Sequence, residues 1–172
     1  MILFLDYDGV LHPDSVYLVR GRPVLQEEGH LFMWAPVLEE LLTPYPKLNI
    51  VLSTSWVRML GFGRARDYLP AGLRHRVIGG TWHSAMGRQS EGAHRVECNW
   101  FVEASRFGQI SRYRSRAGSR AARWLAIDDD ADGWEEELRS HLVETDGDIG
   151  LSSQSAQQEL AQKLSWLASL EQ

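Results

Sequence analysis

Residues 1–9 of the chain read MILFLDYDG, and this stretch decides the fold because it joins a short apolar run to a polar turn. The run ILFL is typical of a buried strand that is covered on both faces in a parallel sheet. Asp6 and Asp8 follow two residues apart, so an extended backbone would point both carboxylates the same way. Gly9 then allows a sharp turn or the close approach of a ligand. Ligands of open α/β sheets bind at the carboxyl ends of strands, and two carboxylates there repel each other without a proton or a cation, so the stretch predicts a metal site.

Two later apolar runs also end in polar residues. Leu48–Leu52 leads into Ser53 and Thr54, and Trp124–Ile127 leads into Asp128, Asp129 and Asp130. Carboxylates from two strands that meet at one sheet edge suit Mg²⁺, which typically binds one or two carboxylates together with waters and phosphate oxygens. A DxD or DDD motif alone is equally typical of a turn or a helix cap. The occurrence of both at the ends of apolar strands favours the metal site.

The remaining pattern alternates between strands and helices. We expect a hairpin at 16–26, helices at 35–43, 100–114 and 134–140, strands at 76–82 and 141–144, helical turns at 56–60 and 64–69, a loop at 83–97, and a last helix capped by Ser152 or Ser153. This alternation predicts an α/β fold with a central parallel sheet between layers of helices. With 172 residues and no internal repeat or long linker, we expect one domain over residues 1–172.

Composition limits the classes of protein that the chain can represent. It is 44% hydrophobic and 24% charged, as in globular proteins. The lone Cys98 excludes an internal disulfide and a cysteine-based zinc cluster, and it suits a reducing compartment. We see no secretory leader before the first strand and no apolar run of membrane-spanning length, so we expect a cytoplasmic protein without a membrane partner.

Charge is distributed unevenly along the chain. The segment from Trp56 to Trp124 contains thirteen Arg, no Lys and four acids, which gives it a charge of +9. Because the net charge of the chain is −5, the remaining residues together carry −14. A basic middle in an acidic protein suggests an anionic substrate or nucleic acid. The alternative is that these arginines lie on solvated faces and pair with the acidic part.

Several motifs resemble the haloacid dehalogenase (HAD) superfamily of phosphotransferases. DYDGVL at 6–11 matches its first motif, DxDGxL, while IVLST at 50–54 resembles its second motif and LAIDDD at 125–130 its fourth. With VLSTSW and SRFGQISRY, these stretches are similar to HAD domains of Swiss Army Knife RNA repair proteins. The resemblance implies a three-layer Rossmann-like core with a central parallel sheet. The short segments between the motifs leave no room for a large cap domain, so a small flap formed by the hairpin at 16–26 and the stretch at 83–97 would be the only lids.

The resemblance further implies a Mg²⁺-dependent phosphatase or phosphotransferase. Asp6 would attack phosphorus to form an aspartyl-phosphate. Asp8 would protonate the leaving oxygen and then deprotonate water, which requires a pKa above the value of ~4 for a free Asp. Mg²⁺ would be held by Asp6, the backbone carbonyl of Asp8, and Asp128 or Asp129.

Phosphate binding would fall to a hydroxyl and a cation. Ser53 would donate a hydrogen bond to a phosphoryl oxygen, with Thr54 as the alternative. The superfamily usually supplies a Lys, or sometimes an Arg, from the helix before the fourth strand, and no Lys occurs between Lys47 and Lys163. We therefore choose Arg106, which opens the helix containing SRFGQISRY and could bind phosphate in bidentate fashion.

A few other residues admit two interpretations each. His12 could contact the substrate or stand in a turn beside Pro13, and Asp132 could join the metal site or cap a helix. Trp34, Trp56, Trp82 and Trp100 could stack on a base or pack in the core. Cys98 is expected to be a small buried hydrophobe.

The substrate implied is a phosphomonoester, and the basic middle together with an open site suggests the end phosphate of RNA or DNA. Three other functions compete with a phosphatase. A non-catalytic phosphate- or metal-binding module of the same fold would lack the nucleophile or the acid, whereas both Asp6 and Asp8 are present. A receiver domain would carry its phosphorylated Asp on a middle strand, which here ends in hydroxyls. A metal-dependent nuclease could use the same carboxylates and Mg²⁺.

Overall fold

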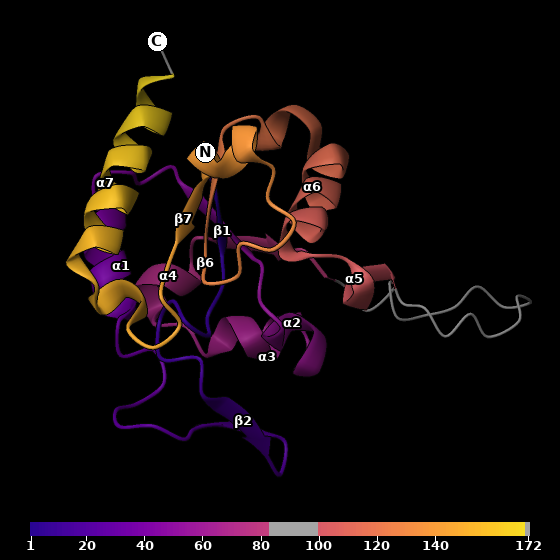
Figure 1. The fold of residues 1–172 in the computed structure, drawn as a ribbon, viewed down its shortest axis with the longest axis vertical. Coiled ribbons are helices and arrows are strands. Elements are labelled where there is room, and N and C mark those ends of the chain that lie inside the picture. The colour runs from indigo at the N-terminus through magenta and orange to yellow at the C-terminus, as the bar shows by residue number, and fades with distance from the viewer. Residues whose placement is uncertain (83–99, 171–172) are drawn as a thin grey trace, which may run out of the picture.

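The computed structural model describes residues 1–82 and 100–170, and a five-stranded parallel sheet lies at its centre (Figure 1). From one edge to the other, the sheet consists of β5 (Val77–Gly80), β4 (Asn49–Leu52), β1 (Ile2–Leu5), β6 (Trp124–Asp128) and β7 (Leu142–Glu144), with every neighbouring pair parallel. The predicted α/β fold with a central parallel sheet is confirmed.

Helices connect the strands and cover the sheet. They are α1 (Ala35–Leu42), α2 (Trp56–Met59), α3 (Phe62–Asp67), α4 (Ala71–Arg74), α5 (Trp100–Glu103), α6 (Arg106–Ala117) and α7 (Gln154–Ser169), with 3-10 turns at Gly118–Ala121, Glu136–His141 and Gly150–Ser152. In Figure 1, α1 and α7 lie on one side of the sheet and α6 lies on the other. None of the described helices is long and apolar enough to cross a bilayer.

The strands are apolar on both faces because both faces are covered. Leu3 of β1 lies in one buried cluster with Leu38 of α1 and Leu164 of α7. Phe4, the next residue, lies in a second cluster with Ile110 of α6. All five side chains are fully buried, and burying one such side chain stabilises a fold by about 1.5–3 kcal/mol. The continuous run ILFL therefore has the pattern of a central parallel strand.

The register of the sheet brings three polar strand ends to one level. Leu5 pairs with Leu52 of β4 and with Ile127 of β6. The ladder continues one residue further, because the Asp6 amide donates to Ile127 O at 3.1 Å and the Ser53 amide donates to Leu5 O at 2.8 Å. Ser53, Asp6 and Asp128 therefore lie side by side, at the ends of the neighbouring strands β4, β1 and β6.

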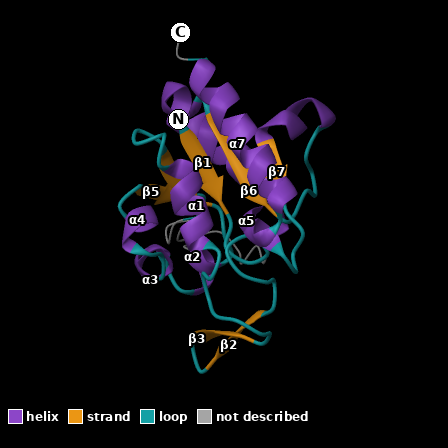
Figure 2. Cartoon of the chain, turned by 90° about the vertical axis from the view of Figure 1, so that its left-hand side faces the viewer, coloured by secondary structure: helices purple, strands orange, loops and turns teal. Residues whose placement is uncertain are grey.

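A small hairpin follows β1, as the sequence predicts for 16–26. Its strands β2 (Val16–Val19) and β3 (Arg22–Leu25) are antiparallel and separate from the main sheet. Figure 2 shows the hairpin projecting from the end of the molecule toward which β1 points. Pro23 is paired with Leu18 in this two-stranded ribbon, where every strand is an edge.

Two predicted helices differ from the structure. The single helix expected at 100–114 is two helices, α5 and α6, because the Ser105 side chain caps α6 by accepting a hydrogen bond from the Gly108 amide. The helix expected at 134–140 is a 3-10 turn at Glu136–His141. Ser153 is the cap of α7, accepting from the Ala156 amide. The loop expected at 83–97 lies outside the described residues.

Candidate metal and phosphate site

Three carboxylates from two adjacent strand ends form one cluster at this edge. Asp6 follows β1, Asp128 ends β6 and Asp129 follows it, and one oxygen of each lies within 4.8 Å of the others. Asp6 and Asp128 are buried and Asp129 is half-buried. The predicted convergence of the amino-terminal acids with the late aspartate run is confirmed for these three residues.

Gly9 determines how closely the first loop approaches this cluster. Its φ of +66° is left-handed, and a Cβ at this position would lie 2.4 Å from a carboxylate oxygen of Asp129. The loop is held by Thr145, whose hydroxyl donates to Gly9 O at 2.8 Å and whose amide donates to Asp128 O at 3.0 Å. Glycine is therefore required here both for the turn and for the space that the Asp129 carboxylate occupies.

Arg106 places a guanidinium between two of the carboxylates. Its Nη2 lies 2.9 Å from Asp6 Oδ2 and its Nε lies 2.9 Å from Asp128 Oδ2. Arg106 is the first residue of α6, so the Ser105 cap that starts the helix also fixes where this side chain leaves the backbone. The side chain is only 15% exposed, which strengthens both ion pairs relative to surface pairs.

Electrostatics at the site are dominated by burial. Burial raises the pKa of Asp6, with Arg106 opposing this rise, and the same burial together with Asp6 raises the pKa of Asp128 well above its usual range. Burial and then Asp6 and Asp14 raise the pKa of Asp129 to about 7. Burial alone would lower the pKa of Arg106, but the charges of Asp6 and Asp128 outweigh burial and raise this pKa above its ordinary value. The guanidinium therefore stays charged.

These residues fit a divalent cation. Three carboxylates face one guanidinium, so full ionisation would leave surplus negative charge in a buried place. Burial first, and the neighbouring carboxylates second, raise the pKa values of Asp128 and Asp129. The ligand atoms that Asp6, Asp128 and Asp129 offer are all carboxylate oxygens, the type that Mg²⁺ prefers. The Asp8 carboxylate is not part of this cluster.

Asp8 instead lies in a separate set of hydrogen bonds. The Trp56 indole N–H lies 3.0 and 2.9 Å from its two carboxylate oxygens, and His12 Nε2 lies 3.1 Å from one of them. His12 is fully buried, and its Nδ1 accepts from the Phe32 amide at 3.3 Å, so the proton of the neutral ring is on Nε2 and points at Asp8. Two donors thereby fix the position of the Asp8 carboxylate.

The two hydroxyls after β4 have different partners. Thr54 is fully buried, hydrogen-bonds to Asp6, and accepts from the Trp56 amide at 3.3 Å. Ser53 is also fully buried, but its Oγ has no hydrogen-bond partner within the ranges that the structure describes. A buried hydroxyl left unpaired is costly, so Ser53 is the hydroxyl still able to donate to a ligand.

Two cavities adjoin the site. One of about 350 Å³ is lined by Arg58, Ser55, Arg106 and Asp130, among others. A smaller one of about 40 Å³ is lined by Asp8 and by apolar residues of the hairpin and α2, including Tyr17 and Met59. The first offers a path to Arg106, and the second places the flap beside Asp8.

Some contributors were missed or left undecided by the sequence. His12 directly follows the turn at 9–11 and is buried, with its Nε2 3.1 Å from an Asp8 oxygen, and Trp56 is the second donor to Asp8. Thr145 was not singled out, because no local motif marks it. Asp132 is exposed and its amide donates to Asp130, outside the cluster. Cys98 lies outside the described residues, as does the side chain of Trp100.

Comparison with known proteins assigns the family. A family model described as the HAD domain in Swiss Army Knife RNA repair proteins matches residues 2–156. No curated protein and no solved structure matches the chain. The matched range contains all three polar strand ends and Arg106, which agrees with the resemblance in the motifs. The chain therefore belongs to the family of HAD domains in Swiss Army Knife RNA repair proteins.

Proposed function

We propose that the protein is a Mg²⁺-dependent phosphomonoester hydrolase that acts through an aspartyl-phosphate on Asp6. HAD domains are commonly phosphohydrolases, and membership of the family suggests a hydrolase here. One observation carries the proposal furthest: the Arg106 guanidinium lies 2.9 Å from the buried Asp6 carboxylate, and the hydroxyl of Ser53, which follows the adjacent strand, has no hydrogen-bond partner in the described part of the chain. A nucleophile, a cation and a hydroxyl donor at one strand edge are what phosphoryl transfer needs.

In the first step, an Asp6 carboxylate oxygen attacks phosphorus, and the bond between phosphorus and the leaving oxygen breaks. Arg106 donates hydrogen bonds to the phosphoryl oxygens, and Ser53 donates one more. In the second step, water attacks phosphorus, the bond to Asp6 breaks, and inorganic phosphate leaves. Desolvation favours a neutral Asp6, so the charge of Arg106 beside it supports the ionised form that attack requires.

Asp6, Asp128 and Asp129 would hold Mg²⁺, as the fit of their oxygens suggests, with the Asp8 backbone carbonyl as the further ligand that the resemblance implies. A bound Mg²⁺ would supply positive charge that lowers the repulsion between carboxylate and phosphate and stabilises the transferred group.

Asp8 serves as the general acid and base in this proposal. It gives its proton to the leaving oxygen in the first step and removes a proton from water in the second. Its carboxyl group is 19% exposed, so both the leaving group and water can reach it. Trp56 and His12 are positioning residues that hold the carboxyl group toward the substrate.

The substrate that we favour is the end phosphate of a nucleic acid. The only covering element described is the small hairpin, which leaves the site open to a large substrate. Arg58 and Arg106 both line the cavity of about 350 Å³ and would meet a polyanion. The description of the family names RNA repair, which agrees with this choice.

Hydrolysis of an aryl phosphate tests the proposal. We expect turnover that requires Mg²⁺, stops in the presence of a chelator, and is lost in both Asp6→Asn and Asp8→Asn. Turnover that survives Asp6→Asn would remove the covalent mechanism, and no turnover by the native protein on any phosphomonoester would favour a non-catalytic module. Oligonucleotides phosphorylated at the 3′ or the 5′ end, compared with small sugar phosphates, test the substrate. Shortening of an unphosphorylated oligonucleotide would indicate a nuclease instead.

A further inference from the structure

A third cavity, of about 290 Å³, lies between α6 and the edge strand β5, apart from the carboxylate cluster. Its lining includes Arg112, Arg116 and Arg120 on one side and Ile78 and Thr81 on the other, and none of its lining residues is acidic. We call this cavity the α6–β5 groove. It shares no lining residue with the cavity beside Arg106.

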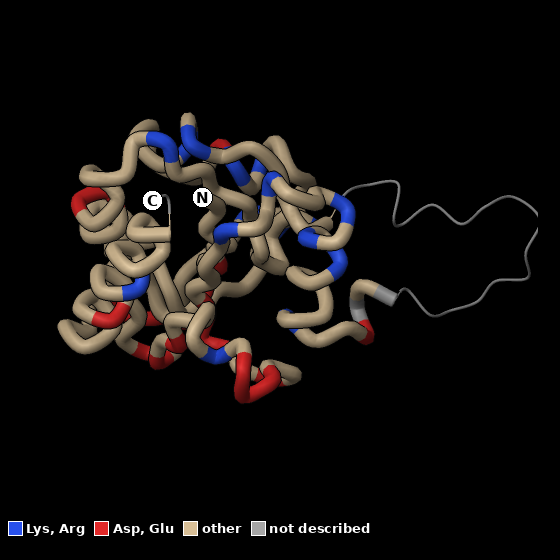
Figure 3. Tube along the Cα trace, turned by 90° about the horizontal axis from the view of Figure 1, so that it is seen from above, with Lys and Arg blue, Asp and Glu red and all other residues tan. Residues whose placement is uncertain are grey.

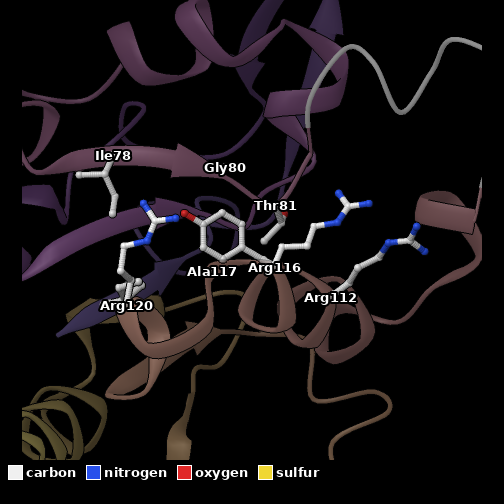
Figure 4. Close-up of a pocket in the computed structure, with 9 residues that line it drawn as sticks. Ile78, Gly80, Thr81, Arg112, Arg116, Ala117 and Arg120 are labelled. Atoms are coloured by element: carbon white, nitrogen blue, oxygen red, sulfur yellow. The ribbon is translucent and has the colours of Figure 1, made fainter.

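Two of the three arginines lie on one face of α6, and the third follows the end of the helix. Arg112 and Arg116 are four residues apart in the helix, so their Cβ atoms lie about 5–6 Å apart, and Arg120 lies in the 3-10 turn Gly118–Ala121. Figure 4 shows Arg120, Arg116 and Arg112 in sequence from beside Ile78 to beyond Thr81. Arg116 and Arg120 form no ion pair with any acid in the described ranges. Their charge is therefore available to a ligand.

The opposite wall of the groove is suited to a sugar or a base. Ile78 is 54% exposed on β5. The Tyr113 hydroxyl lies close to Gly79, where an added Cβ would come within 3.2 Å of it. Thr81 is only 2% exposed, and its hydroxyl has no hydrogen-bond partner among the residues described. A buried, unpaired hydroxyl that lines a cavity indicates a polar ligand.

We propose that the α6–β5 groove binds the sugar–phosphate backbone of a single-stranded nucleic acid, with Arg112, Arg116 and Arg120 contacting successive phosphates. The three arginines make one wall of the groove basic, as a path for a phosphate backbone requires, and the apolar wall around Ile78 suits the bases or sugars between the phosphates. An acidic peptide would need no such wall. Figure 3 agrees, because most Lys and Arg lie over the side of the molecule that carries α6 and most Asp and Glu lie elsewhere.

The position of the groove gives it a role in the proposed function. Arg106 begins α6 at the carboxylate cluster, and Arg112 lies about 9 Å further along the helix at 1.5 Å per residue. A strand lying in the groove would thus run toward the site where its end phosphate is hydrolysed. This role in substrate placement rests on the proposed function, whereas the binding of the strand does not.

Fluorescence anisotropy with a short, labelled, unphosphorylated single strand tests the binding without involving hydrolysis. We expect Arg116→Gln/Arg120→Gln to weaken binding about tenfold and to reduce the slope of log affinity against log salt by about 0.7 for each lost phosphate contact. Ile78→Glu, at an exposed position, should weaken binding as well. The matched control Lys47→Gln/Arg74→Gln removes the same charge at exposed positions outside the groove and should bind as the native chain does.

The outcomes separate this proposal from the proposed function. Arg116→Gln/Arg120→Gln should keep native turnover of an aryl phosphate, and Asp6→Asn should keep native affinity for the strand. Unchanged affinity for the strand in Arg116→Gln/Arg120→Gln would overturn the assignment of the α6–β5 groove as the binding site. An equal loss of affinity in Lys47→Gln/Arg74→Gln would overturn it as well, because it would show that net charge alone determines binding. Competition by polyglutamate as effective as that by unlabelled strand would overturn the assignment to nucleic acid.

Discussion

The guanidinium of Arg106 lies 2.9 Å from a carboxylate oxygen of Asp6, although 100 residues separate the two in the chain. The same side chain reaches Asp128 at 2.9 Å through its Nε. The planar, forked guanidinium contacts the ends of β1 and β6 through two different nitrogens, whereas a Lys would have to reach both from a single nitrogen. Arg106 thus joins two strand ends as well as placing positive charge beside Asp6.

Replacement of Arg106 should separate its positive charge from its contacts with two strand ends. We expect Arg106→Gln to lower kcat/KM for an aryl phosphate by about 10²–10³, the usual cost of losing one preorganised donor. Arg106→Lys should recover part of this loss, because it restores charge but contacts only one carboxylate. Circular dichroism checks that both variants fold. Native activity in Arg106→Gln would show that another cation binds the phosphate.

Gly9→Ala should abolish metal binding. The new Cβ would collide with Asp129 at 2.4 Å, and the left-handed φ would cost a further 1–2 kcal/mol, approximately. Gly21→Ala is the matched control, because Gly21 has a φ of +76° but no atom of residues 1–82 or 100–170 within 4 Å of an added Cβ. We expect both variants to lose stability and only Gly9→Ala to lose the rise in Tm on addition of Mg²⁺. Equal Mg²⁺ responses would contradict the close approach of this loop to the metal site.

Trp56→Phe should lower kcat while leaving KM nearly unchanged. The variant keeps a ring among Tyr7, Phe32 and Tyr68 but removes the N–H that lies within 3.0 Å of both Asp8 oxygens. The Asp8 carboxyl group would then be held by His12 alone, so we expect a loss of about tenfold, within the range that general acid–base catalysis contributes. The loss should be measured on two phosphate esters, an aryl phosphate with a good leaving group and an ester with a poor one. It should be smaller on the aryl phosphate, whose leaving oxygen needs less protonation, and an equal loss on both would argue against positioning of the acid.

Ser53→Ala and Thr54→Val should have opposite consequences for stability. Ser53 has no hydrogen-bond partner among the described residues, so its replacement should leave the free energy of unfolding unchanged or slightly increased. Thr54→Val removes the acceptor of the Trp56 amide and should destabilise the protein by about 1–3 kcal/mol. Urea unfolding measures both values, and KM for the phosphate ester should rise in Ser53→Ala. A marked loss of stability in Ser53→Ala would show that the hydroxyl is already paired.

The metal-free protein should be more stable at pH 5.5 than at pH 8. The folded pKa of Asp129 is about 7, above its ordinary value, so the folded state binds more protons than the unfolded state between about pH 4 and pH 7. Its contribution to stability is complete below the unfolded pKa and is lost as the pH rises through the folded pKa.

Urea unfolding in a chelator, at several pH values, measures this dependence. Asp129→Asn should flatten the curve, and Mg²⁺ should stabilise the native protein most at pH 8, where the carboxylates are ionised. A native curve that rises between pH 5.5 and pH 8 in the chelator would contradict the raised pKa.

The parts of the fold predictable from the sequence are those with strong local signals. The apolar runs before Asp6, Ser53 and Asp128 become β1, β4 and β6, because a strand buried on both faces must be apolar throughout. The hairpin followed from a Gly-Arg turn between two short β-rich runs. The break between α5 and α6 was missed, since Ser105 has no Gly or Pro beside it and acts as a cap only through its hydrogen bond to Gly108.

In the site, too, only the residues with a local sequence signal could be predicted. Asp6 and Asp128 stand at strand ends, where a general rule places ligands, and the structure brings them together. The donors to Asp8 could not be inferred, because Trp56 lies 48 residues away and His12 is positioned by Phe32, 20 residues beyond it. Such contacts depend on tertiary packing and leave no local pattern.

The hydrogen bond from Thr145 to Gly9 spans 136 residues, and it makes the loop after β1 dependent on the last third of the chain. The Leu151 amide reinforces this dependence by donating to Val10 O. A fragment that stops after Asp129 would contain every residue assigned to chemistry here, yet it would leave the DYDG turn without its anchor. Truncation experiments on this domain should therefore keep the chain through α7, because an inactive shorter piece would report on a missing scaffold and not on a missing reagent.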